Sequence, residues 1–293
     1  MNNEQLSVEC GAHPRCSIFL LFICCSCSAQ VRISDDAISE GQQCFRIETP
    51  TAVYLYQKEA GGFSNIHDSN GTDWIQFRKT SEAAYPRSAA SDYRGLPNLV
   101  FRSDDGGAGH PGFDKMTTEM VAPHRIRSVS NSGKWQWSWT FYAKFAELSV
   151  EKIDTAHAYW FLYEGPIAGN FSPQTHVWGS DISGPSHEQP DLVKGPELYG
   201  HWQTVYFGDR NYDQTFFVQQ MEQDTLRDLY TYMGNSKDGN DAHDGMVVFG
   251  FGRAEGATPL ITTPLRFRIG FYNGMIEDRG DHQEILQYVE KLN

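Results

Sequence analysis

The chain has 293 residues, of which 40% are hydrophobic and 13% aromatic, and its formal net charge is −13 at pH 7. This apolar content suffices for a large buried core and excludes a disordered chain. The basic residues are scattered along the sequence, so it gives no support for a nucleic-acid surface. A polyanionic partner would need a local basic pocket.

The first thirty residues differ from the rest. An apolar run over 17–25 follows Arg15 and precedes Cys27-Ser28-Ala29, which is the pattern of a secretory signal. The run is too short to span a bilayer. We therefore expect residues 1–29 to be a signal peptide, with export to the periplasm or the medium, and 30–43 to be an N-terminal extension.

Cysteine usage agrees with export. Five of the six cysteines lie in the expected leader, which leaves Cys44 as the one thiol of the body and permits no internal disulfide. Cys44 stands in an apolar stretch and is expected to be a small buried hydrophobe and not a nucleophile. Lipidation at Cys27 is the alternative, but the preceding Cys24-Cys25-Ser26 matches that signal poorly, so we favour a soluble product without a membrane span.

Beyond residue 40 the sequence predicts one short strand after another, separated by turn clusters. Aromatic and β-branched residues are enriched in these runs. The fourteen expected strands cover 44–48, 52–58, 62–67, 74–77, 99–102, 117–121, 125–129, 134–144, 147–154, 158–163, 204–207, 215–219, 246–252 and 265–272.

Helical spacing occurs at the C-terminus, where Ile285, Leu286, Val289 and Leu292 recur after Asp281 as a possible cap. This helix is expected to close one edge of the sandwich. Residues 222–232 fit a short helix or an extended segment nearly equally well. With no internal repeat and no linker, we predict an all-β chain: a single large antiparallel β-sandwich over 44–293 with a short C-terminal helix.

Two aromatic segments suggest a sugar site. Trp135, Trp137 and Trp139 share one face of a strand, and 159–165 leads to Glu164 before a long loop that contains Trp178. Flat rings such as Trp137, Tyr163 and Trp178 suit the C–H face of a pyranose, while polar groups hold its hydroxyls. The alternative is that the same alternation builds a sandwich core. We expect at least one of the two strands to face a binding cleft.

Long loops concentrate sites on a rigid β scaffold. Three loops exceed what simple connections need, and we expect the first two to lie at the active end. They are 93–113 (Tyr93-Arg94-Gly95-Leu96-Pro97-Asn98 through the glycine-rich stretch around His110), 164–201, and the polar 235–245.

Several motifs carry a family resemblance. Residues 47–50, 56–63 and the Asp-x-x-Gly-x-Asp-Trp turn at 68–74 look like the first hairpin of galactose-mutarotase-like sandwiches. Together with 93–98, 110–112, 160–165 and 205–209, they resemble small exported proteins of bacterial polysaccharide-degradation clusters. Some of those proteins look like dehydratases acting on uronic acids of ulvan-type glycans. The resemblance spans residues 44 to about 275 and implies a galactose-mutarotase-like or jelly-roll-like sandwich.

Water elimination across C4 and C5 of a uronic acid needs a base for the C5 proton, an acid for the departing hydroxyl, and donors against the carboxylate. Such donors stabilise the developing enolate-like charge. Arg94 is the preferred clamp because its planar fork matches a carboxylate, and Asn98 can assist it. The elimination requires no redox cofactor.

The acid and base candidates are His110, His124, Tyr93 and Glu164, with roles that stay exchangeable among them. His110 stands among glycines, which suits a ligand approach or a flexible turn. His124 is followed by Arg125, whose charge favours a neutral imidazole, but it also fits a strand-edge surface position. Tyr93 fits either a sugar site or a packed position in the core. Glu164 fits either a sugar site or a solvated position at the end of a strand.

Arg125, Asp209 and Arg253 complete the candidate substrate contacts. Asp209 and Arg253 both end apolar strands, and they equally suit a mutual salt bridge. No cofactor and no metal are expected, because the histidines lack ligand spacing and the acidic turn at 68–73 lacks the later glutamate of a calcium loop.

We therefore expect an exported lyase whose partner is an anionic oligosaccharide or polysaccharide, most simply a dehydratase that forms a 4,5-unsaturated uronyl residue. The alternatives are an endo- or exo-acting polysaccharide lyase, an aldose-epimerase-like enzyme that uses Glu164 with a histidine, and a non-catalytic carbohydrate-binding protein.

Overall fold

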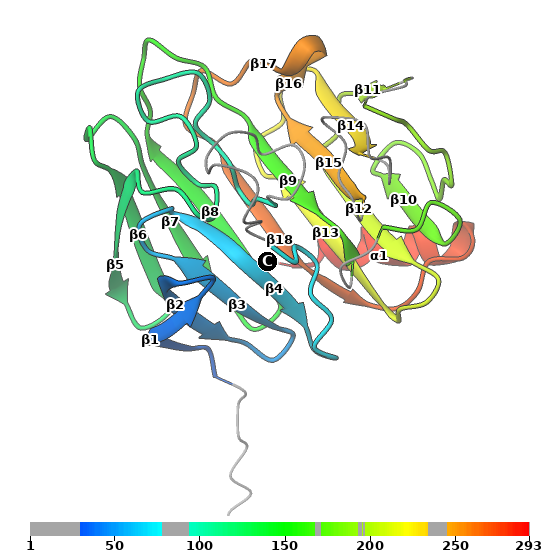
Figure 1. Cartoon of the computed structure of the whole chain (residues 1–293). Coiled ribbons are helices and arrows are strands. Elements are labelled where there is room, and N and C mark those ends of the chain that lie inside the picture. The colour runs from blue at the N-terminus through cyan, green and yellow to red at the C-terminus, as the bar shows by residue number, and fades with distance from the viewer. Residues whose placement is uncertain are drawn as a thin grey trace, which may run out of the picture.

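A computed structural model describes residues 30–77, 94–167, 171–192, 195, 197–233 and 245–292. These residues form antiparallel β-sheets and one α-helix near the C-terminus (Figure 1). The fold is therefore all-β, as predicted. The expected signal peptide lies outside the described residues.

Three sheets of four or more strands make up the body. One has the order β1-β2-β3-β4: β1 (Arg32–Ser39), β2 (Gln42–Glu48), β3 (Ala52–Gln57) and β4 (Gly62–Asp68). The largest has the order β10-β12-β13-β18-β8-β7-β6-β5: β10 (His176–Ser180), β12 (Thr204–Asp209), β13 (Gln214–Gln220), β18 (Arg266–Asn273), β8 (Phe145–Lys152), β7 (Gln136–Phe141), β6 (Arg125–Ser130) and β5 (Met116–Ala122). The third has the order β11-β14-β15-β9: β11 (Leu198–Gly200), β14 (Asp228–Met233), β15 (Met246–Phe251) and β9 (Phe161–Gly165). A small hairpin of β16 (Arg253–Ala254) and β17 (Thr258–Pro259) flanks a single 3-10 turn, Glu255–Ala257.

The segment 95–99 joins the two four-stranded sheets. On one side Gly95 and Glu164 exchange backbone hydrogen bonds, and Leu162 N donates to Pro97 O at 2.9 Å. On the other side Phe63 N donates to Leu96 O at 2.8 Å. The segment thus fills the place of a strand between β9 and β4, so the two sheets act as one layer that faces the eight-stranded sheet.

Aromatic side chains fill the space between the layers. Phe63 of β4 packs edge-on against Trp139 of β7 with 4.9 Å between ring centroids. At the other end Phe161 of β9 stacks on Phe267 of β18 at 4.5 Å. Period-two alternation places these rings inside, and burial of such rings is the main stabilising term of a sandwich.

The helix α1 (Arg279–Glu290) covers the far face of the eight-stranded sheet. Its Ile285 and Val289 pack with Val177 and Phe217, so it covers a face and does not close an edge as predicted. Asp278 is the N-cap, and its carboxylate accepts from Gly280 N and Asp281 N. The expected cap, Asp281, instead returns a side-chain bond to the cap backbone, which completes a capping box.

Some expected elements differ from the observed ones. Residues 74–77 and 99–102 form no strand. Trp74 N and Phe77 N make single bonds to Ile66 O and Ser64 O of β4, and Leu99 N and Val100 N both donate to Ala108 O of a loop. Residues 222–232 contain β14 and no helix. The expected N-terminal extension forms β1 and pairs with β2. Across the described ranges, no helix is both long and apolar enough to cross a membrane.

Candidate active site

The candidate site lies on the outer face of the layer that contains β9 and β15. Along β9, Phe161 and Tyr163 point into the core, so Leu162 and Glu164 point outward by strand alternation. Glu164 pairs with Gly95 on one side and with Val248 of β15 on the other. This arrangement places the buried carboxylate of Glu164 between two strand neighbours on the outward side of β9.

His110 approaches Glu164 from the glycine-rich loop. The distance from His110 Nε2 to Glu164 Oε2 is 3.5 Å, and the two residues are only 1% and 4% exposed. The loop reaches this position because Gly109 N donates to Ala60 O and Gly109 O accepts from Asn98 N, both at 2.8 Å. A titratable pair is therefore held in a site that excludes bulk water.

The hydrogen bonding of His110 determines which ring nitrogen carries a proton. His110 Nδ1 lies 2.9 Å from the carbonyl oxygen of Pro111, which can only accept, so Nδ1 is the N–H donor. In a neutral imidazole, Nε2 then presents a lone pair toward the carboxylate of Glu164. A proton held by either partner removes this repulsion, so the geometry favours a pair that holds one proton between an acid and a base.

Gly95 makes the close approach of these side chains possible. A Cβ atom at Gly95 would lie 2.8 Å from His110 Cδ2 and 3.2 Å from Glu164 Oε2. The first of these distances is shorter than real Cβ contacts allow. The His110 ring thus packs directly against the backbone of Gly95.

Asn98 and Arg94 belong to the same segment. Asn98 Nδ2 donates to Glu164 Oε2 over a long 3.5 Å, with Asn98 in the left-handed region at φ 29°. Arg94 is fully buried and directly precedes Gly95. The structure therefore brings together Asn98, His110 and Glu164, which the sequence predicts in separate loops and strands, and Arg94 adjoins them along the chain.

Arg253 lies across the same face. Gly250 pairs with Leu162 of β9, and the space above Gly250 is occupied by the stem of Arg253, whose Cβ and Cδ would lie 2.9 and 3.1 Å from a Cβ there. The guanidinium stands 5.0 Å above the centroid of the Trp160 ring. The outward face of β9 is thus shared by the arginine and by Glu164.

Arg253 is a buried cation without a hydrogen-bond partner at two of its nitrogens. The residue is 7% exposed, and within the part of the chain that the structure describes, its Nε and Nη1 are buried and bond to nothing. Burial lowers the pKa of Arg253, and the charges of Glu164 and Glu197 oppose that effect. Buried charges are ordinarily paired, so this fork is set up to receive an anionic group.

Asp228 holds the backbone that presents Arg253. Its two oxygens accept from Trp202 N and from Gly252 N, each at 2.8 Å, and Gly252 adopts φ 63° just before Arg253. Burial raises the pKa of Asp228 from 3.8 to about 7, while the two backbone donors act in the opposite direction. Sequence reasoning missed Asp228, because its role depends on two backbone groups that are distant in sequence.

Three other proposed contacts lie in the core between the layers. Trp137 donates from Nε1 to Tyr56 OH at 3.0 Å, and Tyr163 OH donates to Trp74 O at 2.8 Å. Trp178 packs against Tyr230 at 4.6 Å. The tryptophan face of 135–139 therefore lines the core and no cleft, and for that strand the cleft interpretation was wrong.

The remaining proposed residues lie elsewhere. His124 is exposed in the turn between β5 and β6, and Arg125 forms an ion pair with Glu151 at 2.7 Å on the outside of the large sheet. Asp209 accepts from Thr175 Oγ1 at 2.6 Å and from Asn211 N at 2.8 Å, so it closes a turn and forms no salt bridge with Arg253. Tyr93 lies outside the described residues.

Two further features bear on chemistry. Cys44 is buried as predicted, its Sγ donates to Gln42 O at 3.4 Å, and burial raises the pKa of its thiol to about 11, which disfavours the nucleophilic thiolate. Among the described positions, no three His, Cys, Asp or Glu side chains gather as a metal site requires.

No protein-family model matches the chain, and no curated protein matches its sequence. Solved structures with a similar fold include a protein provisionally described as an aldose 1-epimerase from Escherichia coli K12, at 9% identity and TM-score 0.47 over 83% of this chain and 99% of that one. A galactose mutarotase related enzyme from Lactobacillus acidophilus has 11% identity and TM-score 0.46 over 80% and 99%. A heparan sulfate lyase mutant from Pedobacter heparinus has 11% identity and TM-score 0.36 over 85% of this chain and 36% of that one. With TM-scores below 0.5, these likenesses assign no activity to the chain.

The surroundings of the pair show what the arrangement can do chemically. The Glu164 carboxylate and the His110 imidazole lie together in a buried site, with one long contact from the amide of Asn98. On the same face lies Arg253, which has two buried donors without an acceptor among the described residues. Such a group can transfer a proton at carbon or oxygen while it holds an acidic substituent.

Proposed function

We propose that this protein is a lyase that acts on uronic-acid-containing oligosaccharides by β-elimination, most simply as a dehydratase. The observation that carries the proposal is Arg253, whose buried Nε and Nη1 have no partner among the described residues. A substrate carboxylate supplies an acceptor, through a charge-assisted hydrogen bond, to a buried donor of Arg253 that has none. The ring of Trp160, whose centroid lies 5.0 Å from the guanidinium, gives the buried cation a favourable cation–π contact.

Glu164 and His110 carry out the proton transfers in this proposal. The unprotonated member of the pair removes the proton from C5, and the C5–H electrons form the C4=C5 double bond. The C4–O bond breaks, and the oxygen leaves as water after it takes the proton that the pair holds. Arg253 stabilises the charge that develops on the carboxylate as C5 is deprotonated.

An epimerase-like reaction is the second candidate, favoured by the same pair. A carboxylate and an imidazole 3.5 Å apart also suit proton exchange between a sugar ring oxygen and its anomeric hydroxyl. That reaction needs no carboxylate on the substrate, so it does not account for the unpartnered donors of Arg253. A carbohydrate-binding module needs neither the buried pair nor the fork.

The test is the ultraviolet absorbance of a 4,5-unsaturated uronate when the purified protein is added to ulvan oligosaccharides and other uronates, with mass spectrometry of the products. The expected result is a rise in absorbance with loss of one water and no shortening. A rise with shortening indicates a depolymerising lyase. No rise on any uronate, with interconversion of sugar anomers instead, favours the epimerase.

A further inference from the structure

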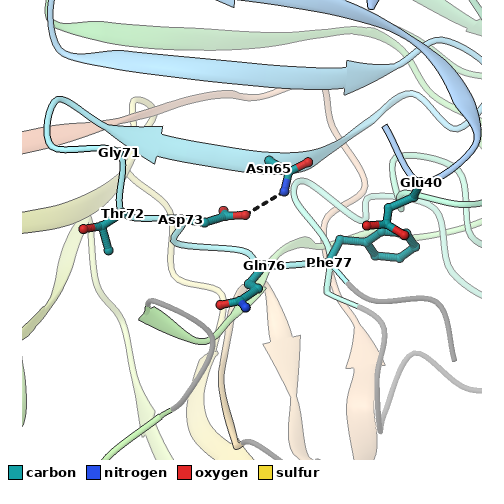
Figure 2. A pocket seen from close by; sticks show the side chains of 7 residues that line it. All are labelled: Glu40, Asn65, Gly71, Thr72, Asp73, Gln76 and Phe77. Atoms are coloured by element: carbon teal, nitrogen blue, oxygen red, sulfur yellow. Dashed lines mark hydrogen bonds between the residues drawn. The ribbon is translucent and has the colours of Figure 1, made fainter. Parts of the chain in front are cut away.

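A hollow on the molecule lies between the β1–β2 turn and the segment that follows β4 (Figure 2). Its volume is about 540 Å³, within the range of ligand sites. The side chains that line it are mostly uncharged polar or acidic, with one aromatic ring: Glu40, Asn65, Thr72, Asp73, Gln76 and Phe77, together with Gly71. None of them belongs to the acid–base pair or to Arg253.

Three of these side chains can form hydrogen bonds with a ligand in the hollow. Gln76 Oε1 is buried and bonds to nothing within the described ranges, and the structure gives the side chains of Glu40 and Thr72 no partner there either. Gln76 and Glu40 also adopt the left-handed backbone region, at φ 43° and 51°. Non-glycine residues rarely adopt it, so the local fold holds both against their intrinsic preference.

Asp73 and Asn65 form the rigid wall of the hollow. Asn65 Nδ2 donates to Asp73 Oδ2 at 2.6 Å, the contact drawn in Figure 2, and Asp73 Oδ1 accepts from Ile66 N and Ile75 N at 3.1 Å each. Burial opposes the charge of Asp73, yet its hydrogen bonds with His67 and Asn65 hold its pKa below the ordinary value. The wall is therefore anionic, which disfavours a second acidic group.

A chain of polar contacts connects this hollow to the acid–base pair. Gly112 N, two residues after His110, donates to Gln57 Oε1, and Gln57 Nε2 donates to Ser39 O at 3.2 Å. The Ser39 hydroxyl then donates to Asn65 Oδ1 at 2.8 Å. From the other side, Gly165 lies against the backbone of Trp74 and Ile75, so closely that a Cβ there would lie 2.2 Å from Trp74 O. The hollow and the pair thus adjoin along the same layer.

We propose that this hollow is a subsite for a neutral sugar residue of the oligosaccharide whose uronate occupies the candidate active site. The proposal rests on the proposed function and extends it to a substrate of more than two sugar units with a neutral residue at a distance from the uronate. Carboxylate, amide and hydroxyl groups match sugar hydroxyls, and the unpaired Gln76 Oε1 gains a donor on binding.

The experiment measures binding of a disaccharide and a tetrasaccharide, both containing a uronate and prepared from ulvan, by titration calorimetry. The variants are Gln76→Ala and Glu40→Gln, and the control is Gln223→Ala, which removes an exposed glutamine side chain from a different depression. We expect each subsite variant to weaken tetrasaccharide binding about tenfold more than disaccharide binding, as the loss of one or two hydrogen bonds predicts. The control should match the wild type.

Equal affinities of variant and wild type for the tetrasaccharide, an equal loss for both ligands, or no tetrasaccharide binding by the wild type would each overturn the subsite. Turnover is followed separately by the absorbance of the unsaturated product. Tetrasaccharide binding that depends on Gln76, without any turnover, would support the subsite and contradict the lyase. Turnover with unchanged binding in the variants would support the lyase and contradict the subsite.

Discussion

His110 Nε2 and Glu164 Oε2 face each other at 3.5 Å in a site shut off from solvent, while His110 Nδ1 is held by the carbonyl of Pro111. The imidazole therefore turns Nε2, the ring nitrogen that can gain or lose a proton, toward the carboxylate. When one of the two groups holds a proton and the other does not, they form an acid and a base in direct contact.

The first prediction concerns this pair as a unit. Glu164→Gln and His110→Gln should each lower kcat on a uronate substrate by about 10² to 10⁴-fold, the range for a positioned acid or base. The double variant should be no slower than the worse single one, because either change already removes the shared proton. Circular dichroism checks that the fold persists. Multiplicative losses would show that the two residues act independently.

Arg253 should determine how strongly kcat/KM depends on the substrate carboxylate. Arg253→Gln is expected to lower kcat/KM on uronates by about 100-fold, as loss of a charge-stabilising donor does. Methyl esters of the same substrates should lose less, because they lack the anion that the fork binds. Arg125→Gln removes an arginine already paired with Glu151 on the outside of the large sheet and serves as the control. Equal losses on acid and ester would contradict the clamp.

Gly95 should tolerate no side chain. In Gly95→Ala the new Cβ would lie 2.8 Å from His110 Cδ2, so the ring must move away from Glu164. Activity should fall by about 100-fold, since small displacements of a catalytic group have effects of that size. Gly280→Ala in the first turn of α1, where a Cβ meets only the side chain of Asp278, is the control. Full activity in Gly95→Ala would show that His110 need not stay in place.

The contact between acid and base also predicts stereochemistry. Since the two groups lie side by side, they reach the C5 proton and the C4 oxygen from one side of the sugar ring. Glucuronic acid, which has both on the same face, should be a substrate, whereas galacturonic acid, which has them on opposite faces, should react far more slowly. Matched oligosaccharides and the absorbance of the unsaturated product measure the ratio. A preference for galacturonic acid would point to an acid on the other face.

Asp228 should make stability depend on pH. Burial raises its folded pKa to about 7, so between pH ~4 and ~7 the folded protein holds a proton that the unfolded chain has released. Its contribution is fully present below pH ~4 and is lost as the pH rises through ~7, by up to about 4 kcal/mol. The free energy of unfolding of Asp228→Asn, minus that of the wild type, should therefore rise with pH over this window. A flat difference for Asp228→Asn would contradict the assigned titration.

Much of the strand pattern could be predicted from the sequence. Alternating apolar residues identify β3, β7 and β18 locally, because a strand that buries one face needs period two whatever it pairs with. β1 reads Arg-Ile-Ser-Asp-Asp-Ala-Ile-Ser and lacks this signal, since it lies at a sheet edge and is held by backbone bonds to β2. β14 was ambiguous for a similar reason, because its neighbours on both sides set its conformation.

The members of the candidate site were partly foreseeable as well. Glu164 ends a strand, His110 stands in a glycine-rich loop, and Arg94 and Asn98 flank a Gly-Leu-Pro turn, all local signals of a functional position. Period two, however, shows which residues share a face and not which face meets the other layer. Trp137 and Tyr163 were therefore proposed as sugar contacts although both belong to the core.

The all-β class, the C-terminal helix and the residue types of the site could thus be predicted from the sequence, because they follow from local periodicity and chemistry. Only the tertiary structure decided that segment 95–99 bridges two sheets, that His110 meets Glu164, and that Arg253 is buried without a partner at two nitrogens among the described residues. Those relationships join positions that lie far apart in the sequence, and the packing of whole sheets brings them together.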